Sequence, residues 1–219
     1  MAGITTAPCN SFKQDLFSGL HCFNSVVSKT ASGVNGAFTL TGLANVTGLA
    51  VGMAVTGTNI AAGAVIASID SSSQVTLSKA HTGTITTLTI TFTGDVYKLA
   101  LIKVTPTGTY DQTSTNYTDV TGNSDEVTGT GYSAGGIALT NNGPSLSTNT
   151  AIVDFADISW TTATFSARGC VIYNSSQRGP VATRATSFHD FGGTQTVTVG
   201  TFTLVFPTPD ATNAILRIA

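Results

Sequence analysis

Long stretches of this 219-residue chain carry no charged residue, and threonine, glycine, serine and valine fill them. Only 9% of the residues are charged, against roughly a quarter in an average globular protein, whereas 41% are hydrophobic. Threonine and valine favour strands, and glycine interrupts helices. The composition therefore predicts an all-β protein.

The same shortage of charge limits the possible partners. The nine basic residues are scattered singly along the chain, the formal net charge is −2 and the isoelectric point is about 5.8. A nucleic-acid-binding surface needs clustered Lys and Arg that neutralise successive phosphates. Disorder goes with low hydrophobicity and high net charge, whereas the mean hydropathy here is +0.24. We therefore expect a folded protein that binds no nucleic acid.

Two segments could be mistaken for membrane or export signals. Residues 43–69 are apolar, but Asn45, Asn59 and repeated Gly and Thr break the run, so a buried β segment explains it better than a membrane span. Residues 1–8 have no basic residue and no apolar core, which a secretory signal requires. The three cysteines form no paired motif, as is typical of a reducing compartment. We expect synthesis in the cytoplasm and no membrane association.

The pattern at residues 10–19 predicts a short helix. Asn10 is positioned to cap its N-terminus. Phe12, Leu16 and Phe17 are expected on one apolar face. Because an isolated helix of this length is marginal in water, it needs a surface on which to dock. We therefore treat these three residues as a candidate docking helix, which packs on its own domain or on a neighbouring subunit.

Two β-rich regions follow the helix. Residues 37–93 are almost free of charge and alternate β runs with glycine turns, which is typical of a compact module of about 60 residues. After residue 95, short strands recur about every ten residues, as in an antiparallel sandwich or jelly roll. Strands are expected at residues 37–40, 53–56, 64–69, 74–77, 84–92, 97–104, 136–140, 151–155, 158–160, 164–167, 170–173, 182–188, 196–199, 202–206 and 214–218.

These regions predict two domains. The main domain, residues 1–28 and 95–219, is expected to be an antiparallel jelly-roll-like or Ig-like sandwich with a short N-terminal helix. Residues 29–94 are expected to form a small inserted β domain. Both ends of this insert are polar or contain glycine, which is typical of domain boundaries.

Residues 105–132 form a polar stretch that is too long for a simple turn. Four of them supply acid or amide oxygens within eight residues, namely Asp119, Asn123, Asp125 and Glu126. Their spacing does not match the alternating ligands of an EF-hand, so calcium binding is the less favoured interpretation. Long polar loops on a rigid scaffold usually carry contacts, so we expect these four residues to face a partner.

Carboxylate pairs are the first candidates for catalysis. Asp154, Asp157 and Asp190 could perform acid and base chemistry of the kind that glycan cleavage needs. A spacing of three on an extended segment puts Asp154 and Asp157 on opposite faces, however. The serine and histidine residues are not accompanied by a Gly-x-Ser-x-Gly elbow. We therefore expect no enzymatic activity.

Cysteine and histidine residues are the candidates for a metal site. Cys9, Cys22 and His21 bracket the predicted helix, and Cys170 or His189 could complete a set of ligands. Zinc sites usually show ligands in close pairs at fixed spacings, which are missing here. Buried thiols and hydrogen-bonded histidines are the simpler interpretation, so we expect no metal and no cofactor.

Several segments outside the insert form a recognisable series. The most specific is Gly-Thr-Gly-Tyr-Ser-Ala-Gly-Gly at residues 129–136. The others lie at residues 10–13, 19–21, 97–101, 117–118, 123–127, 152–157, 169–174, 191–193 and 202–207. Together they resemble a family of small structural proteins from tailed bacteriophages. Shorter members pass almost directly from the segment like residues 21–23 to the strand like residues 97–101.

The resemblance implies a component of the virion, assembled in the host cytoplasm, and no enzyme. The favoured function is a capsid decoration or cement protein that binds the outside of the head and stabilises the shell. Its implied partners are the major capsid protein or other virion proteins, and it is expected to form a homo-oligomer, a dimer or trimer. The alternative is a tail or head fibre component that binds a host-surface glycan. The single Trp and the lack of fibre repeats favour decoration.

Overall fold

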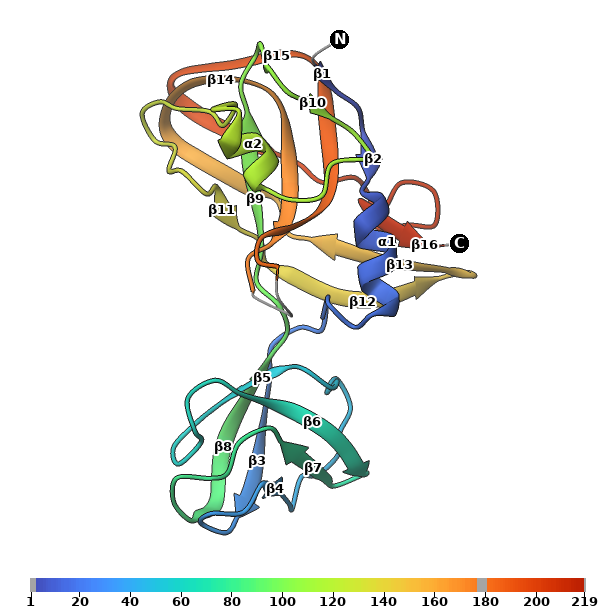
Figure 1. The fold of residues 1–219 in the computed structure, drawn as a ribbon, viewed down its shortest axis with the longest axis vertical. Coiled ribbons are helices and arrows are strands. Elements are labelled where there is room, and N and C mark those ends of the chain that lie inside the picture. The colour runs from blue at the N-terminus through green and yellow to red at the C-terminus, as the bar shows by residue number, and fades with distance from the viewer. Residues whose placement is uncertain (1–2, 177–180, 219) are drawn as a thin grey trace. The chain divides into compact units, whose positions relative to one another are not determined.

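The computed structural model describes residues 3–176 and 181–218 (Figure 1). Strands make up 50% of the chain and helices 6%, which confirms the all-β prediction. The chain forms two compact units. Unit 1 contains Met1–His21 and Val96–Ala219, and unit 2 contains Cys22–Asp95.

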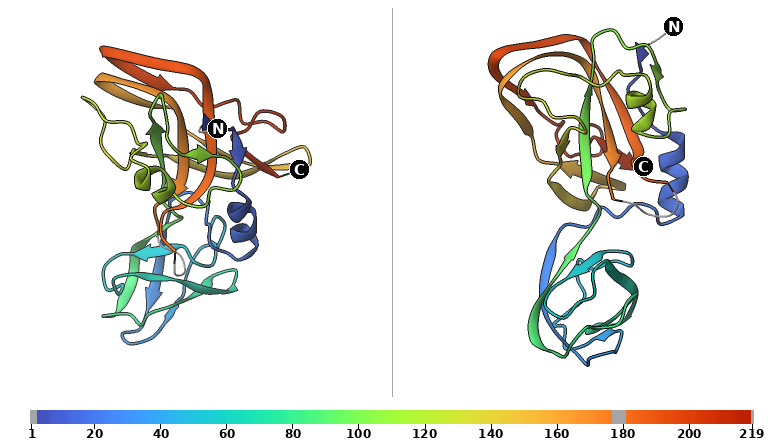
Figure 2. Two further views of the ribbon diagram at one scale, coloured as in Figure 1. Left: turned by 45° about the horizontal axis from the view of Figure 1, so that its top comes forward. Right: turned by 60° about the vertical axis from the view of Figure 1, so that its left-hand side comes forward.

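Unit 2 is a six-stranded antiparallel sheet whose two ends meet. Its strands are β3 (Val27–Gly33), β4 (Thr39–Leu40), β5 (Ala54–Thr56), β6 (Ala64–Ser71), β7 (Gln74–Leu77) and β8 (Ile85–Thr93). They pair in the order β3-β8-β5-β6-β7-β4. Ser32 and Thr41 exchange two backbone hydrogen bonds, of 2.9 and 2.8 Å, which join the end of β4 back to β3. Unit 2 is therefore a small closed barrel, as its ring of strands in Figure 2 shows.

The interior of this barrel is mainly apolar side chains, many of them from alternating strand positions, and His81 is also buried. β7, for example, buries Val75 and Leu77 and leaves Gln74 and Thr76 less covered. The fully buried residues of this core include Leu40, Met53, Val75, Ile90 and Phe92. Period-two alternation of this kind lets each strand satisfy its backbone in the ring while one face fills the interior.

Unit 1 contains the remaining elements. They are β1 (Gly3–Ile4), β2 (Ala7–Pro8), α1 (Asn10–Phe17), β9 (Tyr97–Ile102), β10 (Thr109–Tyr110), α2 (Thr118–Gly122), β11 (Ile137–Ala138), β12 (Asn141–Ser147), β13 (Thr150–Phe155), β14 (Ile158–Asn174), β15 (Arg184–Leu204) and β16 (Leu216–Ile218). One antiparallel sheet has the order β11-β9-β14-β15-β2, and a second has the order β12-β13-β16. The short strands β1 and β10 pair in parallel.

The long hairpin of β14 and β15 dominates unit 1, and Figure 1 shows both strands bending together. A register shift between Ala167 and Gly169 marks the bend. A Cβ at Gly169 would lie 2.3 Å from the carbonyl oxygen of His189, so only glycine fits this close approach. After the bend β14 pairs with β9, whereas before it the hairpin continues as a ribbon.

Most of the expected strands are present, but β3 and β12 were not expected, and two groups of expected strands are joined. Segments expected at 158–160, 164–167 and 170–173 are one strand, β14, because bulges replace the expected turns. The segments expected from residue 182 to 206 similarly form most of β15. The boundary expected at residue 29 falls inside β3, which begins at Val27, so unit 2 begins at Cys22 instead.

Candidate functional site

The candidate docking helix α1 docks on unit 1 through one of its three apolar residues. Phe12 is buried and meets the His21 ring edge to face, with ring centroids 5.0 Å apart. Leu16 is half-buried, whereas Phe17 is 97% exposed. At 100° per residue, Leu16 lies about 40° from Phe12 around the helix and Phe17 about 140° away. The expectation of one shared apolar face is therefore wrong for Phe17.

The expected cap of this helix is also wrong. Cys9 occupies the N-cap position and makes no side-chain capping hydrogen bond. Asn10 is instead the first helical residue, and its backbone N–H donates to the carbonyl of Gln112 at 2.8 Å. This backbone bond to a distant segment satisfies a donor that a side-chain cap would otherwise serve.

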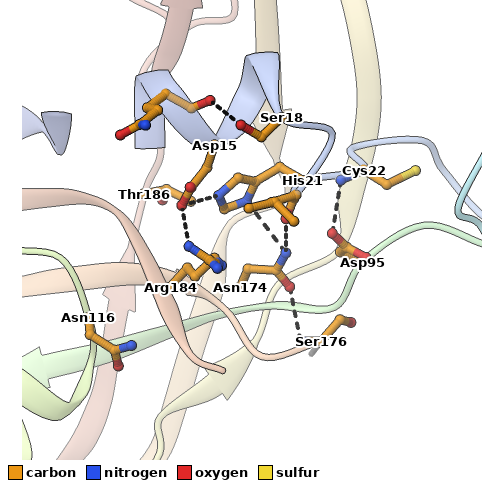
Figure 3. Close-up of polar contacts among 12 residues, drawn as sticks. Asp15, Ser18, His21, Cys22, Asp95, Asn116, Asn174, Ser176, Arg184 and Thr186 are labelled. Atoms are coloured by element: carbon orange, nitrogen blue, oxygen red, sulfur yellow. Dashed lines mark hydrogen bonds and ion pairs between the residues drawn. The ribbon is translucent and has the colours of Figure 1, made fainter. Parts of the chain in front are cut away.

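A buried polar cluster fixes the inner side of α1 (Figure 3). Arg184 of β15 donates from Nη1 to Oδ2 of Asp15 at 2.9 Å, and His21 Nε2 lies 3.9 Å from the same oxygen. Asn174 of β14 donates from Nδ2 to the carbonyl of Leu20 at 3.4 Å. The cluster ties the helix to both strands of the long hairpin. Sequence reasoning missed this cluster, although Asp15 could have indicated it, because an acid three positions after Phe12 lies on the same side of a helix.

Asp125 lies in the interior of unit 1 and does not face a partner. Its side chain is 0% exposed, and Lys103 Nζ lies 2.8 Å from Oδ1. Tyr110 donates its hydroxyl to Oδ2 at 2.6 Å, and the backbone N–H groups of Thr107 and Gly108 also donate to the carboxylate. The prediction that Asp125 contacts a partner is therefore wrong, because a carboxylate with this many internal donors stabilises its own loop.

The pKa of Asp125 reflects two opposing effects. Burial raises this pKa, because it penalises the charged carboxylate. The hydrogen bonds from Lys103, Tyr110 and the two backbone N–H groups lower it, and together they outweigh burial. The net pKa lies well below the usual range of an aspartate, so the group is ionised at neutral pH.

The other three residues of the predicted partner-facing loop also bond within unit 1. Glu126 accepts hydrogen bonds from the hydroxyls of Tyr117 and Tyr132 and from the Gly135 N–H. Asp119 is half-buried and accepts from two backbone N–H groups, and Asn123 donates to the Asp119 carbonyl at 2.9 Å. The acidic oxygens thus organise the backbone of residues 105–136. The exposed side chains of the segment are mainly Thr and Ser.

The three candidate catalytic carboxylates serve three separate structural partners. Asp154 accepts from the Asn142 side chain at 3.0 Å, and Asp157 accepts from the Phe206 N–H at 2.8 Å. Asp190 forms a two-pronged pair with Arg168, at 2.8 and 3.0 Å.

The Arg168 pair borders a hollow of about 420 Å³ lined also by Ile4 and Pro106. Arg168 is the one cationic side chain among the described residues that line the hollow, and Asp190 already occupies its guanidinium.

The cysteines and histidines do not assemble into a metal site. Within residues 3–176 and 181–218, no group of three His, Cys, Asp or Glu residues could hold an ion. All three thiols are buried, and burial raises the pKa of Cys9 to about 12, so this thiol stays protonated at neutral pH. Burial lowers the pKa of His189 to about 4, and its Nε2 lies 2.8 Å from the Ser187 hydroxyl.

Most large aromatic side chains are enclosed in unit 1. Trp160 is 6% exposed and packs among Tyr132, Phe165 and Phe202, with centroids between 5.8 and 6.2 Å from its own. An aromatic ring binds a sugar by offering a bare face. Trp160 offers no such face in this arrangement.

No protein-family model, curated protein or solved structure matches this chain. In the part of the chain that the structure describes, no helix is both long and apolar enough to cross a membrane.

Proposed function

We propose that this chain is a structural protein of a bacteriophage virion that binds the outside of the head and stabilises the shell. The observation that carries the proposal is the run Gly-Thr-Gly-Tyr-Ser-Ala-Gly-Gly at residues 129–136, the most specific part of the resemblance to phage structural proteins. Its partners are the major capsid protein or other virion proteins, and the particle is assembled in the host cytoplasm. The description of unit 1 as a jelly-roll-like or Ig-like sandwich belongs to the same proposal.

The way residues 129–136 are used in unit 1 supports this reading. Tyr132 donates its hydroxyl to Glu126 at 2.7 Å and accepts the Leu101 N–H at 3.0 Å. Gly136 has a φ of +68°, and a Cβ there would lie 1.9 Å from the Leu99 carbonyl oxygen. Residues 129–136 are therefore needed to fold this loop onto β9. Proteins that share the fold would need the same residues even where their surfaces differ.

Two further observations favour the shell over a receptor-binding fibre. The enclosed Trp160 is unsuited to stacking on a sugar. The chain has few charges and a net charge of −2, and a net charge near zero favours association. The protein is therefore proposed to act as a homo-oligomer, a dimer or trimer, placed at symmetry axes of the shell.

Counting copies in purified particles tests the proposal. A shell protein occupies repeated symmetric sites and is expected at on the order of hundreds of copies per particle, whereas a fibre is present at a few tens or fewer. In parallel, purified protein is added to heads that lack it. Saturable binding to heads and slower heat disruption of the bound heads support decoration. Low copy number together with adhesion to host cells would establish the fibre alternative instead.

A further inference from the structure

The free edges of unit 1 differ greatly in length and protection. β2 and β11 have two residues each, β16 has three and carries Arg217, and β12 contains Pro144. Short length, charge, proline and bulges are the usual ways in which an edge strand is kept from pairing with another chain. Along residues 194–204, β15 has a bulge but is long and has neither a charge nor a proline. Its neighbour β2 pairs only with Ser187 and Phe188, so among described residues this part of β15 has a strand partner on the β14 side alone.

The chemistry of this edge suits pairing with a like strand. No residue from 191 to 209 is charged. A bulge at Val199, where φ is +45°, divides the edge into residues 194–197 and 200–204, and the second run has the length of an ordinary strand. Val199 itself is 77% exposed. The run at residues 200–204 is uncharged and is a template for a further strand, with residues 194–197 as a shorter second run.

The face of this ribbon carries a row of paired hydroxyls that a second copy would continue. Ser166 and Thr196 lie 2.8 Å apart across the hairpin, and Ser159 and Thr203 lie 2.9 Å apart. Cross-strand hydroxyl pairs of this kind stabilise neighbouring strands. A third strand that presents Thr at the same spacing extends the row, and β15 of another molecule is such a strand.

We infer that residues 194–204 of β15 pair antiparallel with the same residues of a second copy, forming a two-fold dimer through one continuous sheet. Neither strand brings a charge that would repel the other. Two-fold pairing covers this edge of β15 in both copies at once, so no third copy can add to it. This inference rests on the proposed function, in which the protein acts as a homo-oligomer. It adds which surface forms that oligomer and that the partner is a second copy of the chain.

Charged substitutions on the edge test the pairing in the full-length protein. The edge variant carries Val199→Lys and Thr201→Lys, because both side chains are exposed and lie near the middle of the edge, where antiparallel two-fold pairing would bring the lysines of the two copies close together. The matched control is Thr161→Lys, an exposed position on β14, the strand that pairs with β15 on the side away from the proposed dimer edge. Trp160 fluorescence and circular dichroism verify that each variant is folded.

Sedimentation across a concentration series measures the association. The parent and Thr161→Lys are expected to dimerise equally, and the edge variant is expected to weaken dimerisation at least tenfold. Hydrogen exchange should show protection of residues 194–204 that rises with concentration in the parent and not in the edge variant. A monomeric parent, a trimer, or a dimer that the edge variant leaves intact would overturn the inference.

Head binding separates this inference from the proposed function. A dimer that is lost in the edge variant but does not bind heads supports the pairing and contradicts decoration. A monomeric parent that binds heads contradicts the pairing and leaves decoration standing. If the parent is a monomer that binds heads and only the edge variant loses this binding, the edge of β15 pairs with another virion protein. That result would exclude a second copy of this chain as the partner of the edge.

Discussion

The two units complete their sheets in different ways. In unit 2 the exchange between Ser32 and Thr41 closes the ring, and the buried interior is apolar apart from His81. Unit 1 leaves its main sheet open and, among the described residues, buries two carboxylates within the domain, those of Asp15 and Asp125, whereas the buried Asp95 of unit 2 lies at its end. A closed ring satisfies its backbone by itself, whereas an open sheet relies on side chains or on another molecule to cover its loops and edges. The contrast separates a self-sufficient unit from one that depends on specific polar contacts.

Of the changes that test this comparison, removing unit 2 is expected to have the largest effect. The Cys22 N–H donates to the Asp95 carboxylate at 2.9 Å, and the Asp95 N–H donates to the Cys22 carbonyl at 2.8 Å, so the two ends of unit 2 are adjacent. Joining His21 to Val96 through a short glycine linker should leave unit 1 folded, and residues 22–95 alone should also fold.

Calorimetry checks this prediction, because the shortened chain should lack the melting transition of unit 2 that the parent shows. Trp160 and every tyrosine lie in unit 1, so intrinsic fluorescence follows this unit alone. The shortened chain should keep the fluorescence transition of the parent. A shortened chain without a cooperative transition would show that unit 1 depends on unit 2.

Loss of the buried charge should affect unit 1 strongly. Asp125→Asn removes one partner of the pair with Lys103 and disturbs the bond from Tyr110, and we expect unit 1 to lose about 3 kcal/mol of its free energy of unfolding. The matched change in unit 2 is Asp70→Asn. Asp70 also accepts from Ser68 and Thr76 but lies at the surface, so its replacement should matter much less.

Urea midpoints from Trp160 fluorescence measure the first variant, and circular dichroism of residues 22–95 measures the second. If both variants lose the same free energy of unfolding, the burial of Asp125 does not make its hydrogen bonds contribute more to stability than those of the exposed Asp70.

Acid should destabilise unit 1 before unit 2. Because the folded pKa of His189 is about 4, the unfolded chain binds a proton that the folded chain does not as pH falls below about 6.5. The pKa of Asp125 is also lowered in the folded state, so its contribution is lost as pH falls below about 4. Both signs make unit 1 less stable in acid.

Unfolding at pH 7, 5 and 3 checks this order, with fluorescence for unit 1 and circular dichroism of residues 22–95 for unit 2. Unit 2 contains Asp70 with a lowered pKa at an exposed site, so a smaller loss is expected there. A barrel that is lost first on acidification contradicts the comparison.

The sequence predicted local structure better than it predicted which side chains would be enclosed. The strand expected at residues 74–77 is β7, because alternation and flanking turns are local signals. The bulges of β14 were not predicted. One of them includes Thr162 with a φ of +52°, and the amino-acid composition does not indicate such a backbone conformation at a threonine. Asp125 was placed at the surface because its partner Lys103 is 22 positions away, and only the folded chain brings the two together.

Phe17 is the opposite case, an apolar residue that was expected to be covered and is exposed. Its apolar character predicted a contact, but the helix buries Phe12 and Asp15, and the structure leaves Phe17 exposed. Local periodicity therefore indicated the helix but not which residues it buries.

The smallest predicted effect is the loss of one hydroxyl from the motif at residues 129–136. Tyr132→Phe removes the donor to Glu126 and leaves the Leu101 N–H without its acceptor, and we expect unit 1 to lose about 1–2 kcal/mol. Tyr173→Phe is the matched control, because it removes a single bond to the Gly135 carbonyl and should lose about 1 kcal/mol or less. Unit 2 contains no tyrosine, so its transition should stay unchanged in both variants. If both variants are as stable as the parent, the polar contacts around Glu126 do not help to hold the open unit together, and its packing alone would account for the fold.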